Sequence, residues 1–150
     1  MGDPRRPRKK YKRPKKLYDA ARIAEEKELV KKYGLKNRKE IWKAEAKLKK
    51  IREQAKKMIL HPEKQQDFLK RLASLGLIKN DATLDDVLAL TKENILERRL
   101  QTVVFRKNLA RTIREARQLI THRKIKIGGR ICDVPGRIIK IEEEKEITKK

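Results

Sequence analysis

The side chains of this sequence that could take part in chemistry are mostly cations. Lys and Arg number 44 against 21 Asp and Glu, and the formal net charge is +23. Such an excess repels itself in a compact chain, and a polyanion would neutralise it. Lys and Arg that contact phosphates release counterions, which supplies affinity with little sequence information. The predicted chemistry is therefore the binding of phosphate groups.

The candidate phosphate-binding residues lie in two basic segments. Residues 97–140 carry thirteen Lys and Arg against three acids, more than solubility requires. Residues 1–16 carry nine Lys and Arg, contain three prolines and lack apolar periodicity, as expected of a basic arm that is disordered on its own. Any one of these residues could instead be an ordinary solvated Lys or Arg that contacts no phosphate. The candidates are Arg98, Arg99, Arg106, Lys107, Arg111, Arg114, Arg117, Lys124, Lys126 and Arg130, and, in the arm, Arg5, Arg6, Arg8, Lys9, Lys10, Lys12 and Arg13.

Other kinds of site find little support. One cysteine and two histidines are too few for a disulfide within the chain or an ordinary zinc site, and the acids near residue 85 lack the spacing of a calcium loop. No phosphate-binding glycine loop and no catalytic constellation is present, so we expect no enzyme, no catalytic residue and no cofactor. No apolar run approaches about 18 residues, so we expect no membrane partner.

The residues before 97 follow the pattern of helices. A helix is predicted over 18–33, with Gly34 as its end. Asn37, with Glu40 three residues later, predicts the capped start of a second helix. Apolar residues then recur at spacings of three and four from Ile41 to Met58, along one face of about six turns. A further helix is predicted over 63–75. Thr83, with Asp86 three residues later, resembles a capping box and predicts a short helix from Leu84 to about Leu90.

The period changes within residues 97–140. Apolar residues on one face predict a helix around Leu100, and a capping box at Thr112 predicts a second helix over 113–121. Residues 125–127 and 130–134 alternate and flank two glycines, the pattern of a hairpin. Cys132 is predicted to be buried, and so are Phe68 and Phe105.

These patterns predict a mainly α fold with a small α/β module. The helical N-terminal domain precedes a module of two helices and a hairpin, and a basic arm leads the chain. The expected divisions are 1–16 for the arm, 17–96 for the helical domain, 97–140 for the module and 141–150 for a tail. With so few aromatics, a phosphate-binding surface must recognise mainly shape and backbone. Tyr11 is the best candidate for stacking on a base, and Trp42 suits packing or contact equally.

Several runs carry a resemblance to a known family. Residues 96–106, 116–122 and 125–129 closely resemble the RNA-binding module of small-subunit ribosomal protein four, and residues 1–4, 26–37 and 82–88 resemble its archaeal branch. The resemblance implies a structural constituent of the small ribosomal subunit that binds small-subunit rRNA directly, helps nucleate assembly and contributes to translational accuracy. The implied setting is cytoplasmic. Its implied partners are rRNA, neighbouring small-subunit proteins and messenger RNA near the channel through which it enters.

The chain also departs from the family's pattern. Bacterial members commonly have Asp-Asn where Gln101 and Thr102 stand, and the segment beginning at His122 lacks the glycine that would end the preceding helix. The same module occurs in other proteins. A non-ribosomal RNA-binding factor or a ribosome-rescue factor is therefore the alternative, although such a factor would lack the matching helical N-terminal half.

Overall fold

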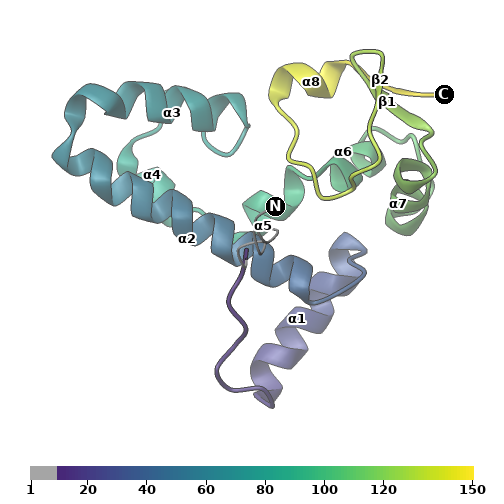
Figure 1. Cartoon of the computed structure of the whole chain (residues 1–150), viewed down its shortest axis with the longest axis horizontal. Coiled ribbons are helices and arrows are strands. Elements are labelled where there is room, and N and C mark those ends of the chain that lie inside the picture. The colour runs from purple at the N-terminus through teal and green to yellow at the C-terminus, as the bar shows by residue number, and fades with distance from the viewer. Residues whose placement is uncertain (1–9) are drawn as a thin grey trace, which may run out of the picture.

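A computed structural model describes residues 10–150 of the chain. Figure 1 shows residues 61–89 at one end of the molecule and residues 100–149, with the small sheet, at the other; the long helix of residues 39–60 runs from the first end toward the second. The elements, in chain order, are α1 (Ala20–Tyr33), α2 (Lys39–Leu60), a 3-10 turn η1 (Pro62–Lys64), α3 (Gln65–Ser74), α4 (Leu84–Ala89), α5 (Lys92–Glu97), α6 (Leu100–Arg106), α7 (Ile113–Thr121), β1 (Ile125–Ile127), β2 (Arg130–Ile131), α8 (Ile141–Lys145) and β3 (Ile147–Lys149). The predicted class, mainly α with a small α/β module, is confirmed.

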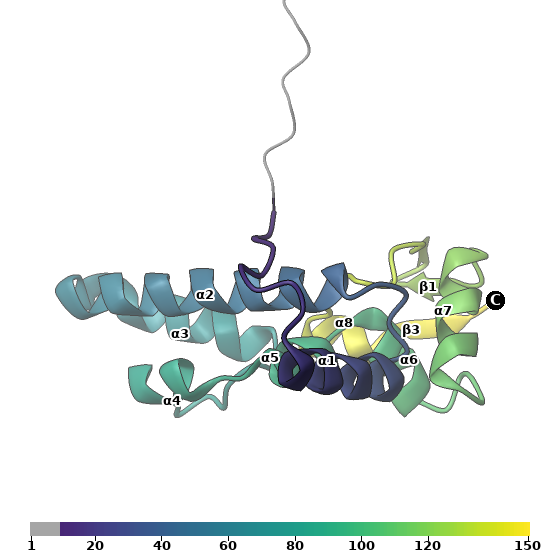
Figure 2. The ribbon, with the colours of Figure 1, turned by 90° about the horizontal axis from the view of Figure 1, so that it is seen from below.

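The limits of α1 and α2 follow from local chemistry. The Asp19 side chain accepts a hydrogen bond from the backbone N–H of Arg22 and caps α1, which ends at Gly34 in the left-handed conformation, with φ of +56°. Helix α2 ends at Leu60, because the residue before Pro62, His61, is disfavoured from the α conformation. Figure 2 shows α2 running above α1 in that view, with α3 beside it.

The predicted start of α2 is wrong in one respect. Arg38, not Asn37, occupies the N-cap position, and its side chain forms no capping hydrogen bond. The carboxylate of Glu40 is not available for a capping box because it binds two distant arginines. A charged partner binds a carboxylate more strongly than a backbone N–H does.

Two capping boxes start the helices that precede the module. Thr83 and Asp86 form the predicted box at α4, and Thr91 and Asn94 form another at α5. In the module, the Thr112 hydroxyl accepts from the N–H of Glu115 and begins α7, whereas the Glu115 carboxylate accepts from the N–H of Arg111. The acidic residues near 85 therefore serve helix starts.

The sheet has three antiparallel strands in the order β2-β1-β3. The predicted hairpin is present, although β2 ends at Ile131 and Cys132 lies just beyond it, buried. Strand β3 pairs with the other edge of β1, with Ile147 opposite Ile127. Residues 141–150, expected as a separate tail, thus add α8 and one edge strand to the module.

The buried apolar side chains of the described residues form two hydrophobic cores, one from residues before 97 and one from residues after it. The first gathers side chains from Leu29 to Leu96, including the apolar face of α2, and the second gathers side chains from Leu100 to Ile147. Phe68 packs against the first core, but the predicted burial of Phe105 is wrong, because its side chain at the end of α6 is 40% exposed. Among residues 10–150, no helix is long and apolar enough to cross a membrane.

Candidate nucleic-acid interface

Arg98, a predicted phosphate-binding residue, has three partners within the protein. Its Nε donates to the carbonyl of Leu75 at 3.0 Å, and its Nη2 donates to the carbonyl of Ile139 at 3.0 Å. Its Nη1 pairs with the Glu144 carboxylate at 2.7 Å, and the side chain is 11% exposed. The Arg98 guanidinium thus connects three parts of the chain: the end of α3, helix α8, and the segment after the hairpin, residues 134–139.

Arg99 and Arg117 share one carboxylate. Glu40 at the start of α2 accepts hydrogen bonds from Arg99 Nη2 and from Arg117 Nη2, the latter at 2.9 Å. Burial raises the pKa of Glu40, but the hydrogen bonds and positive charges of the two arginines outweigh burial and hold its pKa below the ordinary value. The Arg99 side chain is only 8% exposed. Glu40 therefore stays ionised and links the helical half to α6 and α7.

Gln101 completes this cluster from the buried face of α6. Its amide nitrogen lies 3.0 Å from the carbonyls of Gly34 and Ile113, and its oxygen accepts from Arg117 Nη1 at 3.2 Å. A Cβ atom on Gly34 would lie 2.7 Å from Ile113 Cγ2. The C-terminal end of α1 therefore packs closely against the start of α7. Glu40, Arg99, Gln101 and Arg117 are called the Glu40 cluster below.

The backbone reinforces the same junction. No side chain caps α6, and its first N–H groups donate instead to the segment after the hairpin: Leu100 to the carbonyl of Arg137 at 2.8 Å, and Gln101 to that of Pro135 at 3.3 Å. The N–H of Ile139 donates back to the carbonyl of Arg98 at 3.0 Å. The three arginines thus lie where the halves of the protein meet, and their contact with RNA stays a prediction.

The other predicted cations of the module lie on its outside. Arg106 is exposed and has a loose ion pair with Glu97, with 3.7 Å between Nη2 and Oε2. The rest are exposed or half-buried and have no ion pair within residues 10–150: Lys107, Arg111, Arg114, Lys124, Lys126 and Arg130. They surround α7 and the hairpin, at the end of the molecule opposite α3 (Figure 1).

The basic arm is described from Lys10 onward. Lys10, Lys12 and Arg13 are exposed, and Arg5, Arg6, Arg8 and Lys9 lie outside the described residues. Tyr11, the candidate for stacking on a base, lies against Trp42 of α2, with 5.9 Å between the ring centroids, and its contact with a base stays a prediction. The Trp42 indole N–H also donates to Glu26 at 2.9 Å, so Trp42 is a packing residue.

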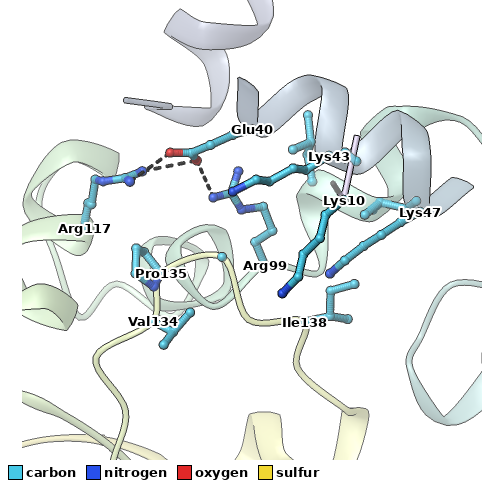
Figure 3. A pocket seen from close by; sticks show the side chains of 13 residues that line it. Lys10, Glu40, Lys43, Lys47, Arg99, Arg117, Val134, Pro135 and Ile138 are labelled. Carbon is cyan, nitrogen blue, oxygen red and sulfur yellow. Dashed lines mark hydrogen bonds and ion pairs between the residues drawn. The ribbon is translucent and has the colours of Figure 1, made fainter. Parts of the chain in front are cut away.

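A pocket of about 430 Å³ opens beside the Glu40 cluster (Figure 3). Lys43 and Lys47 of α2 and Lys10 of the arm line one side, and the segment from Val134 to Ile138 lines the other. Lys43 and Lys47 are absent from the predicted site. Their spacing of four residues places them on one face of α2, but nothing in the sequence indicates which segment faces them.

The described residues offer no site for a metal. Within residues 10–150, no three His, Cys, Asp or Glu side chains gather closely enough to hold an ion. The cations of this part of the chain can form hydrogen bonds and ion pairs to anions such as phosphate.

Comparison with known proteins agrees with this description. The fold and the outward-facing cations define a basic, polyanion-binding protein built on an S4 domain, whose family model matches residues 98–145. The chain is 50% identical to the small ribosomal subunit protein uS4 of Thermoplasma acidophilum, over 99% of this chain and 78% of that protein. It is 47% identical to the uS4 protein of Ignicoccus hospitalis, over 98% of this chain and 92% of that protein. It is 48% identical to that of Hyperthermus butylicus, over 96% and 85%. The chain belongs to the archaeal uS4 family of small ribosomal subunit proteins.

Proposed function

We propose that this protein is a structural, non-enzymatic constituent of the small ribosomal subunit, and so cytoplasmic, that binds small-subunit rRNA directly and contacts neighbouring ribosomal proteins. The observation that carries the proposal is the similarity to uS4 proteins along 96–99% of the chain, which includes the helical half that a rescue factor would lack. The helical half and the S4 domain are present in one chain. The alternative is therefore set aside.

The cations without acidic partners support a direct contact with RNA. Lys107, Arg111, Arg114, Lys124, Lys126 and Arg130 are neutralised by no carboxylate among the described residues. Like charges gathered on one module repel, and RNA phosphates remove that repulsion. Base edges of helical RNA are hidden in a deep groove, so these side chains bind backbone and recognise the shape of a folded RNA. We place the arm, through Lys10, Lys12 and Arg13, on the same RNA.

Three further features belong to this proposal. We place the division between the helical domain and the module at residues 96 and 97, which the two separate hydrophobic cores support. The resemblance to the family supports a contribution to subunit assembly and to translational accuracy. It also supports a position near messenger RNA where it enters the subunit.

A charge-neutralising variant tests the RNA surface. Arg111, Arg114, Lys124 and Arg130 are replaced together by Gln, and binding to a transcript of small-subunit rRNA is measured by filter retention over a range of KCl concentrations. The control replaces the exposed Lys56, Lys57, Lys64 and Lys70, near the far end of α2 and on α3, by Gln. Log affinity falls linearly with log salt concentration, and each phosphate contact removed makes this slope shallower by about 1.

We expect the module variant to lose both affinity and salt dependence, and the control to lose much less. Equal losses in the two variants would mean that the cations act only through net charge. In parallel, the tagged wild-type protein is followed through a sucrose gradient of cell lysate. Sedimentation away from small subunits would refute the ribosomal function itself.

A further inference from the structure

The pocket beside the Glu40 cluster has an excess of positive charge. Among residues 10–150, its lining holds five cations, namely Lys10, Lys43, Lys47, Arg99 and Arg117, and a single carboxylate, Glu40. Both arginines already bind that carboxylate. The three lysines have no ion pair or hydrogen bond within residues 10–150. The charge of the pocket is therefore uncompensated.

The lysines are directed into the pocket by the fold. Lys43 and Lys47 are one turn apart on α2 and both line the pocket; Figure 3 shows Lys47 extending toward Ile138 and Lys43 extending toward Arg99. Lys10 reaches the same space from the arm, which packs on α2 through Tyr11 and Trp42.

The lysines also repel one another. Partial burial, followed by the positive charges of Arg99 and Lys10, lowers the pKa of Lys47. An anion between these side chains would offset the repulsion from the neighbouring cations. The opposite wall, from Val134 to Ile138, offers apolar surface and no acidic side chain. The pocket thus attracts an anion, and the part of the chain that the structure describes places no acid in it other than the neutralised Glu40.

We propose that this pocket binds a backbone phosphate of the RNA, held by Lys10, Lys43 and Lys47 at the junction between the helical domain and the module. Lysine is a compact charge on a flexible stem and lacks the planar fork with which arginine recognises a guanine or a phosphate pair. The site therefore fixes the position of the RNA strand and does not select a base. Because its walls come from α2, the arm and the segment after the hairpin, it forms only when the two halves are correctly joined. This inference rests on the proposed rRNA binding.

The test replaces Lys43 and Lys47 of the full chain by Gln. The control, Lys49→Gln with Lys50→Gln, removes the same charge from positions of the same helix outside the pocket, and all four of these lysines are exposed. The probe is a transcript of small-subunit rRNA, bound by filter retention at several KCl concentrations. Phosphates essential for binding are mapped by ethylation interference. Thermal unfolding shows whether each variant is folded.

We expect the pocket variant to bind about tenfold more weakly than wild type, in the range of one charge-assisted contact. Its salt slope should fall by about 1, and interference at one or two phosphates should disappear. The control should lose less than about threefold. Both variants should keep a Tm close to that of wild type, because Lys43 and Lys47 have no ion pair within residues 10–150 and the Lys49–Glu53 pair is exposed.

Two results would overturn the proposal. If the pocket variant and its control bind equally and show the same interference pattern, the pocket holds no phosphate, although RNA binding by the protein stands. If the pocket variant binds the transcript like wild type but fails to enter small subunits in cells, its ligand is an acidic segment of a neighbouring protein. Failure of the wild-type chain to bind the transcript would instead refute the proposed function.

Discussion

Replacing Glu40 by Gln should destabilise the protein more than any exposed charge substitution. The change keeps the shape of the side chain but removes the only carboxylate that Arg99 and Arg117 share within residues 10–150. Breaking a buried ion pair by removing one partner costs about 3–5 kcal/mol, because the remaining charge stays buried without compensation. Here Glu40 is 15% and Arg117 22% exposed, so solvent screens part of the loss. We expect a decrease of about 2–3 kcal/mol in the free energy of unfolding.

The measurement is urea unfolding of the RNA-free protein, followed by circular dichroism at neutral pH. A loss of this size corresponds to a decrease in Tm of about 5–10 °C for a chain of this length. The control is Glu53→Gln on the same helix, where the carboxylate is exposed and lies 3.9 Å from Lys49. This control should change stability by less than about 0.5 kcal/mol.

The pH dependence gives a second measure of the same carboxylate. The folded-state pKa of Glu40 is lowered from 4.5, so the folded state binds the proton less readily than the unfolded state. The stabilisation by the ionised carboxylate is therefore complete above the unfolded pKa and is lost as the pH falls through the folded pKa. The difference between wild type and Glu40→Gln should be constant near neutrality and shrink below pH 4.5. A variant that loses no more stability than Glu53→Gln, with a difference that does not vary with pH, would refute the structural function of the Glu40 cluster.

Three other substitutions test particular contacts. Arg123 follows α7 with φ of +59°, so Arg123→Gly should raise the free energy of unfolding by about 0.5–1 kcal/mol, seen as a higher Tm; a lower Tm would contradict the strain argument. Ile147 of β3 is buried, so Ile147→Ala should cost about 2–4 kcal/mol in urea unfolding, against less than about 1 for the exposed Ile141→Ala. Equal costs would place the last residues outside the module. Gly34→Ala should lower the free energy of unfolding by about 2–3 kcal/mol by the same assay, because the added Cβ makes a close contact and the positive φ is unfavourable for Ala. Gly129→Ala has the same unfavourable φ, but its Cβ meets nothing within 4 Å, so it should lower that free energy by about 1 kcal/mol. Similar losses at the two glycines would indicate that α1 does not pack closely on α7.

Local patterns were enough to predict most of the elements. The stripe from Ile41 to Met58, the capping residues at Thr83 and Thr112 and the glycine pair at 128–129 each depend on residues within a few positions of one another. Such signals are readable because a helix repeats every 3.6 residues and a strand every two. The misplaced start of α2 shows the limit of this reasoning. Glu40 suits a capping box locally, but distant arginines bind it.

Strand β3 was missed for a related reason. Its three residues, Ile147–Lys149, are too few to show a period, and only the exposed edge of β1 makes them a strand. The non-glycine residue at the end of α7 is another such case. The sequence shows that a glycine is missing, and only the structure shows that Arg123 takes the left-handed conformation in its place.

The amino-acid sequence alone determined that the protein is a strongly basic, mainly α chain of this ribosomal family, because charge, periodicity and motif are properties of the residues themselves. Only the tertiary structure decided which cations remain available to an anion. Arg99 and Arg114 are indistinguishable as sequence letters, yet Arg99 is buried against a carboxylate 59 residues away and Arg114 is exposed. Lys43 and Lys47, which resemble ordinary surface lysines of a helix, become the wall of a pocket when the arm and the segment after the hairpin fold against α2. The electrostatic function of a side chain depends on which charges lie within a few ångströms of it, and chain folding sets those distances.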